Sequence, residues 1–146
     1  MIANYRSLLL SLALIAVVGS MMPSLATAQS IDPEVENRQI ADIFDRALDA
    51  EARDSAWADS TEAMSRKAVI GTAGQAMVWV DTLCATTFCR STLELETPGD
   101  ESAIDDLVFV APFDHGGWIR IHPDGRTVSL YFTRDGFGLP SLTPNG

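Results

Sequence analysis

Cys84, Cys89 and the arginine that follows them, Arg90, are the residues whose types and spacing most directly indicate chemistry. The chain has no other cysteine. A close cysteine pair can form a disulfide, act as a redox pair or supply metal ligands. Redox enzymes typically place two residues between their cysteines, at the start of a helix, whereas four residues separate this pair. The spacing therefore favours a structural disulfide across a hairpin.

A zinc site is the metal alternative, and its candidate ligands are Cys84, Cys89, His115 and His122. The ligand types suit zinc, but their spacing matches no zinc-finger pattern. In an oxidising compartment the two thiols would pair with each other first. We therefore expect neither a metal site nor a cofactor.

An acid beside a histidine is the second pattern with catalytic potential. The segment Asp114-His115-Gly116-Gly117 resembles part of the oxyanion loop of acyl-transfer hydrolases, but the Gly-x-Ser-x-Gly motif of those enzymes is absent. Adjacency in the sequence also does not bring the Asp114 carboxylate into hydrogen-bonding contact with the His115 imidazole. Asp114 and His115, with Arg90 nearby, are therefore weak candidates for the catalytic residues of a small hydrolase or ligand-binding enzyme.

The remaining charged and aromatic residues have structural interpretations. Arg90 could hold an anion, but a salt bridge to Glu94 or Asp81 is the default in so acidic a chain. The acidic pairs Asp100-Glu101 and Asp105-Asp106 could bind calcium weakly, but no Asp-x-Asp-x-Asp-Gly loop is present, which favours a solvated helix face. We expect the tryptophans to lie in the core or on a sheet face rather than to form a ligand-stacking platform: Trp57, Trp79 and Trp118.

Residues 1–28 have the three parts of a cleavable export signal. Arg6 supplies the positive start, and Leu8–Val18 is an apolar run of about 11 residues, too short for a bilayer that needs about 20. Ala26 and Ala28 occupy the two positions that must be small before a cleavage site. We predict cleavage after Ala28 and a mature protein that is periplasmic or extracellular.

The charge of the mature chain limits its partners. The full chain carries a net charge of −10, and removal of Arg6, the only charged residue of the signal, leaves −11. Such a balance argues against non-specific binding to nucleic acid or anionic lipid. We expect a single domain over 29–134, a flexible tail over 135–146 and no stable membrane insertion after cleavage.

The N-terminal half of the mature chain has helical patterning. Asp32-Pro33-Glu34 is typical of a helix start, and apolar residues recur at helical spacing between Ile40 and Leu48. This pattern predicts an amphipathic helix over about 33–53. A second, shorter helix is expected from Asp54 or Ser55 to about Met64.

The period then changes to two. Residues 76–84 and 89–96 alternate like strands on either side of a short connection, and residues 118–121 and 127–132 form a second pair around a Pro-Asp-Gly turn. A helix is expected after Asp100, although residues 108–110 could instead be strand. The layout predicts an α+β fold, with N-terminal helices packed on one face of a mostly antiparallel sheet of about four strands.

Two motifs together resemble a group of small uncharacterised exported bacterial proteins. The first is Asp54-x-x-Trp57-Ala58-x-x-Thr61-Glu62, and the second is Val80-x-x-x-Cys84-x-x-x-x-Cys89-Arg90. In that group a helical region precedes a strand, a Cys-x4-Cys-Arg connection and a second strand. The resemblance covers roughly residues 50–95 and implies the fold and export, but no activity.

These observations favour an exported, non-catalytic domain that binds another envelope or secreted protein or an envelope component. No set of nucleophile, base and oxyanion donor is evident in the sequence. The alternative is a small hydrolase or ligand-binding enzyme that uses Asp114 and His115 near Arg90. The two hypotheses differ in geometry, because the enzyme requires His115, an acid and Arg90 to converge on one concave pocket.

Overall fold

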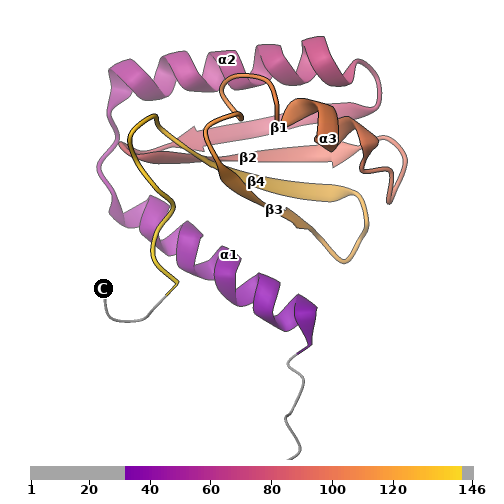
Figure 1. Cartoon of the computed structure of the whole chain (residues 1–146), viewed down its shortest axis with the longest axis horizontal. Helices are drawn as coiled ribbons and strands as arrows, with labels where there is room; N and C mark the ends of the chain where they lie inside the picture. The colour runs from indigo at the N-terminus through magenta and orange to yellow at the C-terminus, as the bar shows by residue number, and fades with distance from the viewer. Residues whose placement is uncertain (1–31, 143–146) are drawn as a thin grey trace, which may run out of the picture. The chain divides into compact units, whose positions relative to one another are not determined.

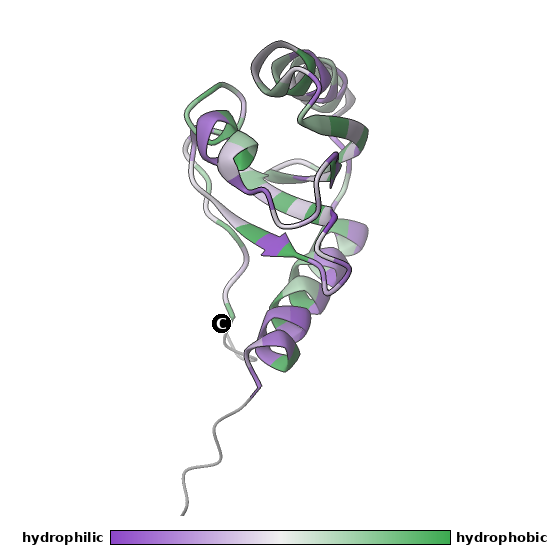
Figure 2. Cartoon of the chain, turned by 90° about the vertical axis from the view of Figure 1, so that its right-hand side faces the viewer, coloured by the Kyte–Doolittle hydropathy of each residue, from purple (hydrophilic) through white to green (hydrophobic). Residues whose placement is uncertain are grey.

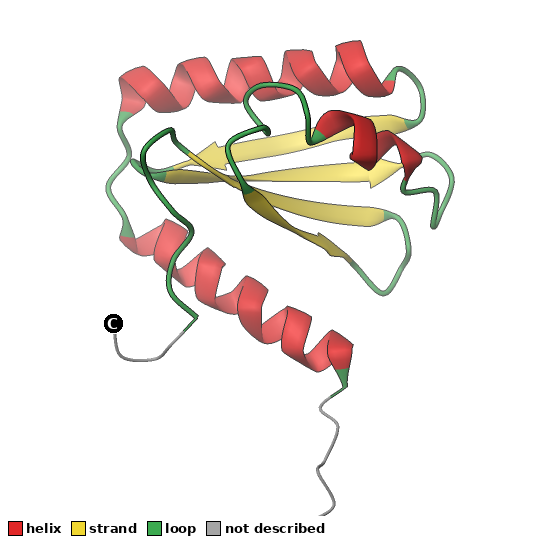
Figure 3. Ribbon diagram, in the orientation of Figure 1, coloured by secondary structure: helices red, strands yellow, loops and turns green. Residues whose placement is uncertain are grey.

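The computed structural model describes residues 32–142, so the predicted signal segment and its cleavage site lie outside the described residues. The helices and strands follow the order α1 (Pro33–Ala50), α2 (Ser55–Ala73), β1 (Met77–Cys84), β2 (Phe88–Leu95), α3 (Ser102–Leu107), β3 (Gly117–Ile121) and β4 (Thr127–Thr133). All three strand pairings are antiparallel. The expected α+β fold with a four-stranded antiparallel sheet is confirmed (Figure 3).

Both long helices begin at a side-chain cap. Asp32 Oδ1 accepts a hydrogen bond from the Glu34 amide at 2.9 Å, and Pro33 occupies the first turn of α1. Asp54 Oδ1 accepts in the same way from the Trp57 amide at 3.4 Å at the start of α2. The sequence therefore located both helix starts correctly.

The second helix is longer than expected, because α2 continues past Met64 to Ala73. Its buried residues recur every three or four positions, and all except Val69 are alanines or carry a hydroxyl: Ala58, Thr61, Ser65 and Ala73. Such residues produce a weak hydrophobic period even when they face a core. The expected end near Met64 was wrong for this reason.

The strands lie in the order β1-β2-β4-β3, so β1 and β3 are the two edges of the sheet. The β1–β2 register shifts between Trp79 and Asp81, where Val80 is the extra residue of a bulge. In the other hairpin, Asp124 accepts hydrogen bonds from the amides of Arg126 and Thr127, both at 2.8 Å.

The helices are divided between the two faces of the sheet rather than gathered on one (Figure 1). On one face, α2 and α3 pack on residues such as Leu93 and Phe132. On the other, Phe44 and Leu48 of α1 pack against Phe88 and Tyr131. Alternate residues of the central strands β2 and β4 therefore contribute to opposite cores. Many residues of α1 are hydrophilic (Figure 2).

Two further segments lie outside the helices and strands. Residues 108–110, for which helix and strand were both open, form turns after α3. The described part of the predicted tail, residues 135–142, contains no helix or strand, and its Leu139 packs against the cluster around Phe44.

Candidate functional site

Cys84 and Cys89 form a disulfide with a Cα–Cα distance of 4.1 Å. The two residues are direct partners in the β1–β2 register, and both side chains are buried. A bonded, buried pair offers no thiolate to a metal ion. Among residues 32–142 there is also no group of three or more His, Cys, Asp or Glu residues arranged to hold a metal.

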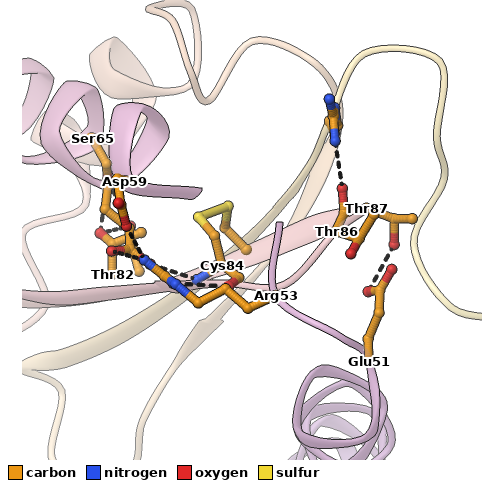
Figure 4. Close-up of a disulfide and its surroundings, with 12 residues drawn as sticks. Glu51, Arg53, Asp59, Ser65, Thr82, Cys84, Thr86 and Thr87 are labelled. Atoms are coloured by element: carbon orange, nitrogen blue, oxygen red, sulfur yellow. Dashed lines mark hydrogen bonds and ion pairs between the residues drawn. A yellow bond between two sulfur atoms is a disulfide. The ribbon is translucent and has the colours of Figure 1, made fainter. Parts of the chain in front are cut away.

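The disulfide end of the hairpin is attached to the segment before α2 and to α2 itself (Figure 4). Arg53 Nη1 donates to the Cys84 carbonyl oxygen at 3.1 Å and to Glu62 Oε1 at 2.6 Å. Glu62 Oε1 also accepts from the Cys84 amide at 3.0 Å. Both polar backbone groups of Cys84 are therefore paired with α2 or its flank, which gives these charged groups a structural role.

His115 and Asp114 lie in the loop before β3 and are about half exposed. His115 Nε2 lies 3.6 Å from Asp114 Oδ1, which is beyond hydrogen-bond distance. The His115 carbonyl oxygen accepts from Thr133 Oγ1 at 2.7 Å. The backbone of His115 is held by β4, whereas its imidazole is not oriented by Asp114.

Arg90 lies on the opposite face of the sheet from the α2 core, against α1. Its Nη1 donates to Asp45 Oδ1 at 2.9 Å, and Tyr131 Oη donates to the same oxygen at 2.8 Å. Burial and the hydrogen bond to Asp45 raise the pKa of Tyr131 above its ordinary value. A salt bridge was expected for Arg90, but its partner is Asp45 rather than Glu94 or Asp81.

A pocket of about 470 Å³ contains His115 but not Arg90 or Asp114. Its apolar walls include Trp57, Met64, Pro112 and Phe132. Its polar residues are His115, Arg134 and Asp135 with two threonines, Thr61 and Thr133. The proposed convergence of His115, Asp114 and Arg90 is therefore not found in the structure.

Arg134 is the main charged residue of this pocket that the sequence analysis did not identify as a site residue. Its guanidinium lies over the Trp57 ring at 5.0 Å from the centroid, and its Nη1 donates to Asp54 Oδ2 at 2.9 Å. The hydrogen bond from Arg134 holds the pKa of Asp54 below its usual range. Arg134 and Asp54 are 80 residues apart, so no local pattern marks the pair.

The remaining predicted residues are separated from this pocket. His122 Nε2 lies 2.9 Å from Ser129 Oγ in the β3–β4 hairpin, and partial burial lowers the pKa of His122. Asp100 Oδ1 accepts from the amide and the hydroxyl of Ser102 at 3.2 and 2.7 Å. Asp100 therefore supports the start of α3.

The three tryptophans do not all lie on one face of the sheet. Trp57 and Trp79 pack at the α2 face, where Arg66 lies over the Trp79 ring at 5.1 Å. Trp118 packs on the other face in edge contact with Phe44, with ring centroids 5.6 Å apart. This arrangement agrees with the expected positions of the tryptophans in the core or on a sheet face.

A second hollow surface follows the free edge of β3. One part of about 370 Å³ lies between the α3–β3 connection and the strand, and another of about 340 Å³ lies between α3, α1 and the strand. Ile119 lines both parts. We call the two together the β3-edge groove.

No helix within residues 32–142 combines the length and the apolar character that a bilayer crossing requires. Comparison of the chain with protein-family models, curated proteins and solved structures finds no match.

Proposed function

We propose that this protein is an exported, non-catalytic α+β domain that binds another protein or an envelope component. The observation that carries the proposal is the β3-edge groove, where apolar side chains remain open to solvent. Phe109 is 82% exposed and Ile119 is 39% exposed. Apolar side chains that gather beside a free strand edge are typical of a binding surface.

The positions of the catalytic candidates support a non-catalytic role. Arg90 is bound to Asp45 on the α1 face, whereas His115 lines a pocket on the α2 face. Thr133 lines that pocket, and its hydroxyl donates to the His115 carbonyl oxygen rather than to the imidazole. A nucleophile activated by His115 would require a hydrogen bond between the hydroxyl and the ring.

Export is supported by the disulfide and by the signal-like sequence of residues 1–28. Disulfides persist in oxidising compartments and are rare in the cytosol. Mass spectrometry of the protein secreted by its expression host tests this part of the proposal. A chain that begins at Gln29 is expected, and an intact N-terminus would contradict cleavage.

A small ligand-binding enzyme is the second candidate, and the pocket that joins His115 to Arg134 favours it. Its volume of about 470 Å³ lies within the usual range of small-molecule sites. The two functions are separated by an esterase and amidase screen of the purified mature domain and its His115→Ala variant. Turnover that is lost in the variant would establish the enzyme and refute the non-catalytic proposal.

Binding itself is tested with the mature domain immobilised on beads and exposed to envelope extract. We expect a retained component that re-forms a saturable complex with the mature domain when both are purified. Albumin immobilised on matched beads controls for non-specific adsorption. If no component forms such a complex, the binding proposal is wrong.

A further inference from the structure

Among residues 32–142, no strand pairs with the outward backbone groups of β3. The Thr133 amide donates to the Gly116 carbonyl and the His122 amide to the Thr127 carbonyl, at 3.3 and 2.8 Å. Hydrogen bonding alternates along an antiparallel pair, so Trp118 and Arg120 also bond to β4. The amide and carbonyl groups of Gly117, Ile119 and Ile121 therefore point away from β4, toward the open edge.

One end of the β3-edge groove is apolar. Its lining is mainly apolar and includes Phe109, Phe113 and Ile119, with Gly117 and a single acid, Asp114. A Cβ atom added to Gly117 would lie 2.3 Å from the Tyr131 carbonyl oxygen, so this position accepts only glycine without a shift of β4. Gly117 thus allows β3 to lie close against β4 at this end of the groove.

The other end of the groove is acidic. Glu101 and Asp105 of the α3 region line it with Ile119 and Ile121. Neither carboxylate takes part in an ion pair within the described residues. The nearby cation of β3, Arg120, is already paired with Glu34, so it does not neutralise this end.

We propose that the β3-edge groove binds an extended peptide segment of a partner protein as an added strand, with an apolar and a basic side chain two residues apart. This inference rests on the proposed binding function and names the partner's chemistry. Side chains on one face of a strand recur every second residue, about 7 Å apart. Gly117 and Ile119 line the apolar end, and Ile119 and Ile121 line the acidic end, so the two ends are separated by one such step.

Charge favours a segment of another protein over a second copy of this chain as the occupant of the groove. The predicted mature chain carries a net charge of −11, so two copies that met at their acidic grooves would repel each other. A basic side chain beside Glu101 and Asp105 would instead be attracted. The occupant is therefore a partner with a basic, apolar strand.

The probe is an acetylated and amidated peptide with a fluorescent label, Thr-Thr-Leu-Thr-Lys-Thr-Thr, titrated with the mature domain and followed by anisotropy. Saturable binding is expected. Replacement of the lysine by glutamate, or N-methylation of the peptide amides that face β3, should abolish it. The Glu101→Gln/Asp105→Asn double variant should bind about fivefold more weakly, as expected for partly exposed ion pairs. Equal binding of the lysine and glutamate peptides would overturn the proposal.

Ile119→Pro tests the strand addition, because the proline removes an outward amide and no hydrogen bond to β4. Ile119→Val, which keeps the amide, is the matched control and should bind like the unaltered domain. Hydrogen exchange of the unaltered domain gives a readout that needs no variant. Binding should slow exchange at the amides of Ile119 and Ile121 and leave those of Trp118 and Arg120 unchanged. Peptide binding without this alternation would refute an added strand.

The outcomes also separate this inference from the proposed function. An envelope component that binds the unaltered domain and the Ile119→Pro variant equally would refute the groove and leave the binding function standing. A dimer of the unaltered domain in sedimentation that Ile119→Pro dissociates would assign the groove to a second copy and overturn the partner proposed here.

Discussion

Cys84 and Cys89 face each other across the β1–β2 hairpin at a position where the backbones do not exchange hydrogen bonds. The next pair toward the turn does exchange one, because the Ala85 amide donates to the Phe88 carbonyl at 3.1 Å. Side chains at non-hydrogen-bonded positions of antiparallel strands lie closest together. The register thus explains why cysteines with four residues between them can bond without bending the hairpin.

The Cys84→Ser/Cys89→Ser variant should fold but be less stable. Closing so short a loop removes only a small amount of unfolded-chain entropy, so the loss should be about 2 kcal/mol, or about 10 °C in Tm. Thermal and urea unfolding followed by circular dichroism measure it. A variant that loses binding or activity at an unchanged Tm would indicate a redox role instead.

Asp45 should contribute to stability more than other acids of α1. Its carboxylate accepts from Arg90 and from Tyr131, and removal would leave a partly buried guanidinium and a buried phenol without that partner. We expect Asp45→Ala to cost about 2 kcal/mol in urea unfolding, less than a fully buried pair because both side chains are partly exposed. Asp42→Ala, an exposed change on the same helix, is the control and should stay within about 0.5 kcal/mol. Equal effects would contradict the role of the Asp45 contacts.

A buried cluster of hydroxyl groups joins α2 to the sheet and gives a third prediction. Thr82 Oγ1 lies 2.9 Å from Ser65 Oγ and 2.6 Å from Ser91 Oγ, and it accepts from Trp79 Nε1 at 3.0 Å. Thr82→Val keeps the side-chain shape but removes a hydrogen-bond partner of Ser65, Ser91 and Trp79. We therefore expect the free energy of unfolding, measured in urea, to fall by about 2 kcal/mol. Thr92→Val, at a half-buried position of β2, should change little. A neutral Thr82→Val would contradict the contribution of these hydrogen bonds to stability.

Local patterns predicted the parts of this fold that depend on neighbours in sequence. The helix cap at Asp32, the cysteine hairpin and the turn around Gly125 all depend on residues within a few positions of one another. The far end of α2 was missed because its buried face uses small and hydroxyl residues such as Ser65 instead of large apolar ones. A short-range pattern measures side-chain hydrophobicity, not burial.

Contacts between distant segments could not be predicted in this way. Arg90 bonds to Asp45 rather than to an acid on its own hairpin because α1 packs on the face opposite α2. The Arg134 contacts with Asp54 and Trp57 likewise join residues about 80 positions apart. The candidate pocket and the β3-edge groove both depend on such placements, so the sequence identified His115 without identifying its surroundings.

The β3–β4 turn should show an acid-dependent contribution from Asp124. The carboxylate accepts from the Thr127 hydroxyl at 2.6 Å and from the amides of Arg126 and Thr127, and these bonds lower its pKa to about 2. Because the pKa in the folded state is depressed, the stabilisation is complete above about pH 4 and is lost as the pH falls toward 2. Carboxyl-carbon NMR titration should show the pKa rising toward the ordinary value in Thr127→Val, which lacks the strongest donor. Thr127→Ser keeps that hydroxyl and should retain the low pKa, whereas equal values in the two variants would assign the shift to the backbone amides alone.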